Sequence, residues 1–214
     1  MKNNVRRYSL LSLLMALLLA LSPVAALAQA TQATQVAPEP TPDSAEAPMN
    51  FFAQLKLHDI YGKPFDTSVF DGKPAFINIW ATWCGPCVSE MPHLDELARE
   101  YADKITIIGL HSEGMTVKDQ ELVLNEEKNE AALALAEKLG LSFPLLNPDA
   151  NLFVLMNDPS YGLQVQVLPT TWLVDENGSI KSVVPSANDK EGWQKIIDGF
   201  LKYLEEEKVG KTEG

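Results

Sequence analysis

Two cysteines, Cys84 and Cys87, are the only cysteines in the 214 residues of the chain. They stand where an apolar run, Ala75 to Ala81, gives way to a helical pattern. Two thiols separated by two residues at the start of a helix can close a small, reversible disulfide. This junction of buried strand, dithiol and helix is the feature that most constrains what the chain can fold into.

The first thirty residues have the order of a secretory signal. Three basic residues precede an uncharged, leucine-rich run at 10–21, and small residues follow at 25–28. This order is typical of a signal peptide, so we assign 1–28 to one and expect cleavage after Ala28 or Ala30. The apolar run is shorter than the roughly 20 residues of a spanning helix, although an uncleaved anchor at 8–28 is the alternative. We therefore predict an exported, extracytoplasmic protein, in the periplasm or at the outer face of the cell membrane.

Composition divides the rest of the chain. Residues 29–50 are rich in Thr, Gln, Ala and Pro, offer little to bury and are predicted to form a disordered linker. Residues 51–207 are long enough for one domain with its own core, and 208–214 are predicted to be a flexible tail. The formal net charge of −12 argues against nucleic acid as a partner, because phosphate binding needs clustered Lys and Arg.

Strand and helix patterns alternate along this domain. Residues 51–57 alternate apolar and polar side chains, which predicts a half-buried strand, and Ala75 to Ala81 reads as a strand buried on both faces. A helix interrupted by Pro92 follows the cysteines. Further strands are predicted at 105–110, 143–146, 165–174 (interrupted by proline) and 179–184, and helices at 129–139, 151–156 and 193–203.

This order of elements predicts an α/β domain with a mixed sheet covered on both faces. The polar stretch from His111 to Lys128 is longer than a plain connection between strand and helix. It either rims the active site or is a surface insertion, and we favour the insertion.

Two motifs about 80 residues apart resemble the thioredoxin fold. They are Ala81-Thr82-Trp83-Cys84-Gly85-Pro86-Cys87, with Pro92 after it, and Leu168-Pro169-Thr170-Thr171-Trp172-Leu173-Val174-Asp175. The leading segment at 57–70, the exported setting and Cys87-Val88-Ser89-Glu90-Met91-Pro92 narrow the resemblance to TlpA- and ResA-like thiol:disulfide oxidoreductases. Over residues 51–205 it implies a central mixed β-sheet flanked by helices on both faces, with an N-terminal extension and an insertion after the strand at 105–110.

The resemblance gives the two cysteines different roles. Cys84 would be the exposed nucleophile, and the free N–H groups and dipole of the helix that it begins would favour its thiolate. Cys87, one turn further and more buried, would resolve the mixed disulfide. The pair is itself the redox centre, so no other cofactor is expected.

The resemblance also implies where a substrate binds. Pro169 would have a cis peptide bond and face the dithiol, and the substrate peptide would pair with the backbone of Leu168. Trp83 would flank the substrate surface, and Gly85 and Pro86 would let the helix start tightly. The expected substrate-binding residues are Trp83, Gly85, Pro86, Leu168, Pro169 and Thr170.

One position departs from the thioredoxin pattern. Many thioredoxins carry a buried aspartate six residues before the first cysteine, whereas this chain has Asn78, which cannot take up a proton. ResA-like proteins have a glutamate three residues after the second cysteine, and Glu90 stands there. We predict that Glu90 is partly buried, has a raised pKa and exchanges a proton with Cys87. The alternative is a solvated helix acid.

The function implied is that of a protein-disulfide reductase. Gly85 and Pro86 between the cysteines resemble the reducing thioredoxins, so we favour reduction of exported proteins over an oxidase or isomerase. Such a reductase needs electrons in an oxidising compartment, and the resemblance implies an integral-membrane thiol electron transporter as their source. Apocytochrome c and methionine sulfoxide reductase are possible substrates that the family suggests.

Metal binding is the non-enzymatic alternative. Zinc is disfavoured because there is no further cysteine, and His58, His93 and His111 lack ligand spacing. A copper carrier would combine the two cysteines with His111 or Met115.

Overall fold

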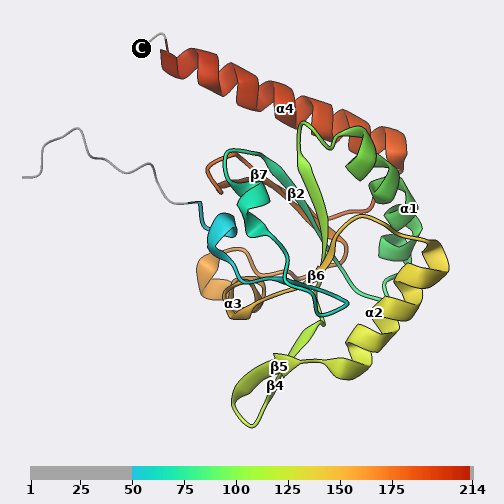
Figure 1. Ribbon diagram of the computed structural model, residues 1–214. Coiled ribbons are helices and arrows are strands. Elements are labelled where there is room, and N and C mark those ends of the chain that lie inside the picture. The colour runs from blue at the N-terminus through green and yellow to red at the C-terminus, as the bar shows by residue number, and fades with distance from the viewer. Residues whose placement is uncertain (1–49, 213–214) are drawn as a thin grey trace, which may run out of the picture. The chain divides into compact units, whose positions relative to one another are not determined.

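The computed structural model describes residues 50–212. The predicted signal peptide and all of the predicted linker except Asn50 lie outside the described residues. A six-stranded sheet has the order β1-β6-β3-β2-β7-β8 (Figure 1). Its strands are β1 (His58–Asp59), β2 (Ala75–Trp80), β3 (Thr106–His111), β6 (Leu145–Asn147), β7 (Thr170–Val174) and β8 (Ile180–Val184).

The sheet is mixed, as predicted. Strands β2, β3 and β6 run parallel to one another, while β7 and β8 at one side and β1 at the other pair antiparallel with their neighbours. Two apolar clusters cover its faces. Figure 1 shows α1 (Gly85–Glu100), α2 (Glu126–Leu139) and α4 (Lys190–Thr212) on one side and α3 (Ala150–Asn157) on the other. The predicted α/β class is confirmed.

Strand β2 divides its side chains between the two clusters. Phe76 and Trp80 pack in the cluster that contains α1, and Ile77 and Ile79 pack in the opposite one. Because side chains alternate along a strand, Asn78 points to the same face as Phe76 and Trp80. A polar amide is therefore placed under α1, inside an otherwise apolar layer.

The N-terminal part of the domain differs from the prediction. Residues 51–57 do not form a strand: η1 (Phe52–Gln54) is a 3₁₀ turn, and strand pairing begins only at β1. The side chain of Asn50 accepts hydrogen bonds from the N–H groups of Phe52 and Ala53 and donates to the carbonyl of Phe70. Asn50 is therefore part of the fold rather than of a linker, and its side chain fixes the turn that replaces the strand.

Other helices and turns depart from the predicted bounds. Helix α1 continues through Pro92 to Glu100. Two short 3₁₀ helices, η2 (Thr67–Phe70) and η3 (Pro159–Tyr161), lie in predicted connections. Helix α4 reaches Thr212, beyond the predicted end at 203, and so includes much of the predicted tail. Its last turns are held by ion pairs of Glu207 with Lys181 and of Lys208 with Glu176. In the described residues, no helix is long and apolar enough to cross a membrane.

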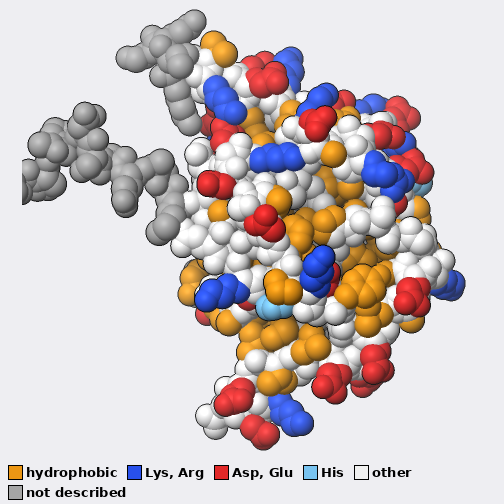
Figure 2. Space-filling model, viewed as in Figure 1, with side chains coloured by type: hydrophobic (Ala, Val, Ile, Leu, Met, Phe, Trp, Pro, Cys, Tyr) orange, Lys and Arg blue, Asp and Glu red, His pale blue; other side chains and the backbone are white. Residues whose placement is uncertain are grey.

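The polar stretch at 111–128 folds as a hairpin of its own. Strands β4 (Met115–Lys118) and β5 (Glu121–Leu124) form a separate two-stranded sheet. Asp119 and Gln120 both have positive φ, 51° and 69°, as the two central residues of a type I′ turn require. Figure 2 shows apolar side chains gathered at the base of this hairpin, where Met115, Leu122 and Leu124 line a cavity of about 390 Å³.

Candidate active site

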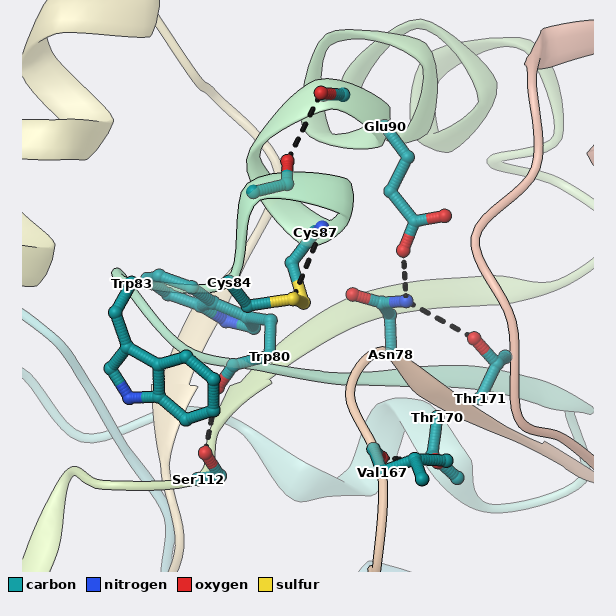
Figure 3. The surroundings of a disulfide bond; sticks show 12 residues. Asn78, Trp80, Trp83, Cys84, Cys87, Glu90, Ser112, Val167, Thr170 and Thr171 are labelled. Carbon is teal, nitrogen blue, oxygen red and sulfur yellow. Dashed lines mark hydrogen bonds between the residues drawn. A yellow bond between two sulfur atoms is a disulfide. The ribbon is translucent and has the colours of Figure 1, made fainter.

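Cys84 and Cys87 form a disulfide at the N-terminus of α1 (Figure 3). Cys84 caps the helix, since its sulfur accepts a hydrogen bond from the backbone N–H of Cys87 at 3.2 Å. Pro86 follows inside the first turn, where a missing N–H costs nothing. In the reduced state, the same free N–H groups and helix dipole would favour a thiolate on Cys84.

The exposure of Cys84 differs from the prediction. Only 3% of Cys84 is exposed, compared with 0% of Cys87, so the expected order is kept but Cys84 is not an exposed residue. The disulfide ties its sulfur to the buried sulfur of Cys87, and the helix cap holds it over the first turn. The open surface around the pair belongs to Gly85, Pro86 and Trp83, of which Trp83 is 65% exposed.

Glu90 is 1% exposed and therefore not a solvated acid. One carboxylate oxygen accepts a hydrogen bond from Asn78 Nδ2 at 2.9 Å. The other accepts from the backbone N–H of Asn188 at 3.1 Å and from Trp193 Nε1 at 3.0 Å. Burial raises the pKa of Glu90, and these three hydrogen bonds only partly oppose it. The predicted burial is confirmed and the pKa shift has the predicted direction, while proton exchange with Cys87 stays a prediction.

Asn78 connects this acid to the sheet. Its Nδ2 also donates to Thr171 Oγ1 at 3.1 Å, and Thr171 lies directly opposite Asn78 in the register of β2 and β7. Figure 3 shows the Asn78 amide between the Glu90 carboxyl group and the disulfide, with its nitrogen toward Glu90. The sequence comparison with thioredoxins flagged this position only as a missing acid.

The second motif begins in a loop and continues as β7. The peptide bond between Leu168 and Pro169 is cis, as the resemblance implies. Thr170 is 4% exposed, and its hydroxyl donates to the carbonyl of Val167 at 2.8 Å, so its side chain holds the loop together. Leu168 is half-buried, and Val167 is 52% exposed.

A groove of about 560 Å³ lies between this loop and the first motif. Trp83 lines it together with Leu168, which places two of the predicted substrate-binding residues on one surface. Its other lining residues are Ser112, Glu113, Met156, Asn157, Val165, Gln166 and Val167. The groove has a mixed polar and apolar lining, and Trp83, one of its lining residues, directly precedes Cys84 in the chain.

Comparison with known proteins identifies the family. The Redoxin family model matches residues 32–197. The chain belongs to the Redoxin family. Thiol-disulfide oxidoreductase ResA of Geobacillus thermodenitrificans is 33% identical over 67% of this chain and 72% of its own. Thioredoxin-like protein YneN of Bacillus subtilis is 34% identical over 66% of this chain and 74% of its own.

A solved structure supports the fold. The thiol:disulfide interchange protein of Chlorobium tepidum superposes with a TM-score of 0.53 at 22% identity, covering 73% of this chain and 98% of that one. The predicted ResA- and TlpA-like membership of the thioredoxin superfamily is confirmed, and so is the predicted enzyme class. This Redoxin-family chain is a thiol-disulfide oxidoreductase with a Cys-x-x-Cys pair.

Glu113 is a site residue of this oxidoreductase that sequence reasoning missed. It accepts a hydrogen bond from Trp83 Nε1 at 2.8 Å, and its carboxylate lies 3.8 Å from Lys128 Nζ. The two partners come from the first motif and from the start of α2. The stretch at 111–128 is thus an inserted hairpin whose first residues rim the site, and its unusual length was the only available signal.

His111, one of the two residues proposed as a copper ligand beside the cysteines, is buried. His111 is 0% exposed, stacks on Trp80 with ring centroids 4.8 Å apart, and has its pKa lowered by burial. Met115 lies at the start of β4. Between residues 50 and 212, no three His, Cys, Asp or Glu side chains gather into a group that could hold a metal ion.

Proposed function

We propose that this oxidoreductase reduces disulfide bonds of exported proteins by dithiol–disulfide exchange. The observation that carries the proposal is the Cys84–Cys87 pair at the start of α1, beside an open groove shared by Trp83 and Leu168. A substrate strand lying in this groove would meet Cys84 before Cys87, because Cys87 is fully buried.

The reaction follows from these positions. The Cys84 thiolate attacks one sulfur of the substrate disulfide, that S–S bond breaks, and the other substrate sulfur leaves as a thiolate that takes a proton. Cys87 then loses its proton to Glu90, whose raised pKa suits a proton acceptor in a buried site. The Cys87 thiolate attacks the Cys84 sulfur of the mixed disulfide, which closes the Cys84–Cys87 bond and releases the second substrate sulfur as a thiolate that takes up a proton.

Export and electron supply complete the proposal. The leader-like sequence at 1–28 supports an extracytoplasmic location, either after cleavage or anchored by residues 8–28. The enzyme then needs a new pair of electrons for each cycle, and an integral-membrane thiol electron transporter is the proposed donor. Oxidised apocytochrome c or methionine sulfoxide reductase are the proposed classes of substrate.

The reduction potential of the pair tests the direction. The purified chain is equilibrated with dithiothreitol and glutathione buffers while tryptophan fluorescence reports the disulfide, because Trp83 adjoins Cys84. We expect a potential below about −220 mV, toward the thioredoxin end of the known range. A potential near about −120 mV would instead assign the enzyme to disulfide formation.

A further inference from the structure

Asn78 has an unused hydrogen-bond acceptor. The residue is 0% exposed, and its Nδ2 donates to both Glu90 and Thr171, yet its Oδ1 is buried without any hydrogen-bond partner. Buried carbonyl oxygens are rarely left unpaired, because losing their water is costly unless another donor replaces it. We therefore expect this oxygen to accept a hydrogen bond in another state of the protein, since it has no donor in the disulfide form.

The surroundings fix where that oxygen points. When it is ionised, the Glu90 carboxylate only accepts hydrogen bonds, so it holds the NH₂ group of Asn78 on its own side. The oxygen is thereby directed to the opposite side, and Figure 3 shows it pointing toward the Cys84–Cys87 disulfide. A disulfide carries no hydrogen, so neither sulfur can donate to it.

We propose that Asn78 Oδ1 accepts a hydrogen bond from the Cys87 thiol when the pair is reduced. A dithiol donor supplies two electrons and two protons, its own sulfurs join in a disulfide, and the Cys84–Cys87 bond opens into two thiol groups. Cys87 is 0% exposed, so its new S–H group has no water to donate to. The unpaired oxygen of Asn78 is the acceptor that the disulfide form holds ready.

This contact would act on the redox equilibrium. In the disulfide form Asn78 carries an unsatisfied oxygen, and in the dithiol form that oxygen is paired, so Asn78 favours reduction. The inference rests on the proposed role of Cys87 as the buried resolving thiol, but not on the direction of the reaction in the cell.

Infrared spectroscopy tests the hydrogen bond itself. In the Cys84→Ser variant, Cys87 is the only thiol and stays reduced, so a single S–H stretching band is observed. We expect a band at the low frequency of a hydrogen-bonded thiol, and a shift to the frequency of a free thiol when Asn78→Leu is added. Asn78→Asp keeps an oxygen at this position and should keep the low frequency. The proposal is wrong if the band of the Asn78→Leu double variant matches that of Cys84→Ser.

The thiol–disulfide equilibrium tests the consequence. Against glutathione, Asn78→Leu should favour the disulfide by about tenfold relative to the unmodified chain, which is about 30 mV for two electrons. Thr171→Val removes the other partner of Nδ2 but leaves Oδ1, and should leave the equilibrium unchanged. An equal shift in both variants would overturn the proposal. If the unmodified chain formed no reversible disulfide with glutathione, the proposed function would fail, while the infrared result would still stand by itself.

Discussion

Helix α1 carries two buried acids whose pKa values move in opposite directions. Glu90 is 1% exposed and Asp95 is 7% exposed, and burial favours the neutral form of both. The pKa of Glu90 is raised, whereas the pKa of Asp95 is lowered. Burial by itself therefore does not determine which acid of this helix binds a proton more readily than usual.

The partners explain the difference. Burial alone would raise the pKa of Asp95, but hydrogen bonds from Ser142, Phe143 and the Arg99 guanidinium together outweigh it. Within residues 50–212, the hydrogen bonds to the Glu90 carboxylate come from neutral groups, namely Asn78, Asn188 and Trp193. The Arg99 cation and two backbone N–H groups favour the ionised form of Asp95, which closes a loop, whereas burial dominates at Glu90 and favours its protonated form.

The largest expected effect separates the two acids by activity. Glu90→Gln keeps the shape of the side chain but removes the proton acceptor, so turnover in disulfide exchange should fall by about 100-fold. If Glu90 accepts the proton, the rate of the unmodified chain should rise with pH as Glu90 ionises, and this rise should be absent from the pH–rate profile of Glu90→Gln. Asp95→Asn, the matched change on the same helix, should retain nearly full turnover. Equal losses in both variants would show that Glu90 acts only through the fold.

For the stability of the fold, we expect the larger effect at Asp95 rather than at Glu90. Asp95→Ala leaves the N–H groups of Ser142 and Phe143 without their acceptor, and Phe143 is too buried for water to replace it. We expect the free energy of unfolding in urea to fall by about 2 kcal/mol, with the turnover of the folded fraction unchanged. A loss of turnover without a loss of stability would contradict the assignment of Asp95 as a structural anchor.

The pH dependence of stability should also differ between Glu90 and Asp95, by a smaller amount and with opposite sign. Because folding raises the pKa of Glu90 above its ordinary 4.5, the folded state binds more protons between these two values, and stability should fall as pH rises through this window. Asp95 behaves in reverse: its contribution is present above its ordinary 3.8 and is lost as pH falls through the lower folded value.

Urea midpoints measured across the acidic and neutral range would resolve both slopes. In Glu90→Gln the downward slope above pH 4.5 should vanish while the acid loss assigned to Asp95 remains. In Asp95→Asn the acid loss should shrink and the downward slope should stay. If Glu90→Gln instead removed the acid loss and Asp95→Asn removed the downward slope, the assignment of the two slopes to these acids would be wrong.

The sequence predicts local chemistry better than distant contacts. The helix cap at Cys84 and the placement of Glu90 on the same helix depend on spacings of three residues, which the chain displays directly. The side of β2 that Asn78 occupies follows from strand alternation once that strand is recognised. These relations are visible in the sequence, but the roles of Cys84, Cys87 and Glu90 were predicted only with the help of the family resemblance.

Contacts across the fold were not predictable in the same way. Asp95 meets Ser142 and Phe143 nearly fifty residues later, and Asn50 meets Glu176 across 126 residues. Asn50 also shows why residues 51–57 were predicted wrongly: alternation of apolar residues fits a strand, but the Asn50 side chain accepts hydrogen bonds from the N–H groups of Phe52 and Ala53, where a 3₁₀ turn forms instead. No local pattern reveals such partners.

Glu113 extends the comparison to a third, partly exposed acid, and gives the smallest expected effect. It holds the Trp83 ring from outside the protein core, as Asp95 holds a loop from inside it. Since the bond is solvent-exposed, Glu113→Ala should raise the KM for a disulfide substrate only about threefold, with kcat unchanged and Trp83 fluorescence altered. Lys128→Met removes the weak ion pair but leaves the bond to Trp83, so it should change neither. A fall in kcat for Glu113→Ala would mean that the orientation of Trp83 controls the reactivity of Cys84 and not only the binding of substrate. Glu113 would then act in the reaction, as Glu90 does, and not only in the structure, as Asp95 does.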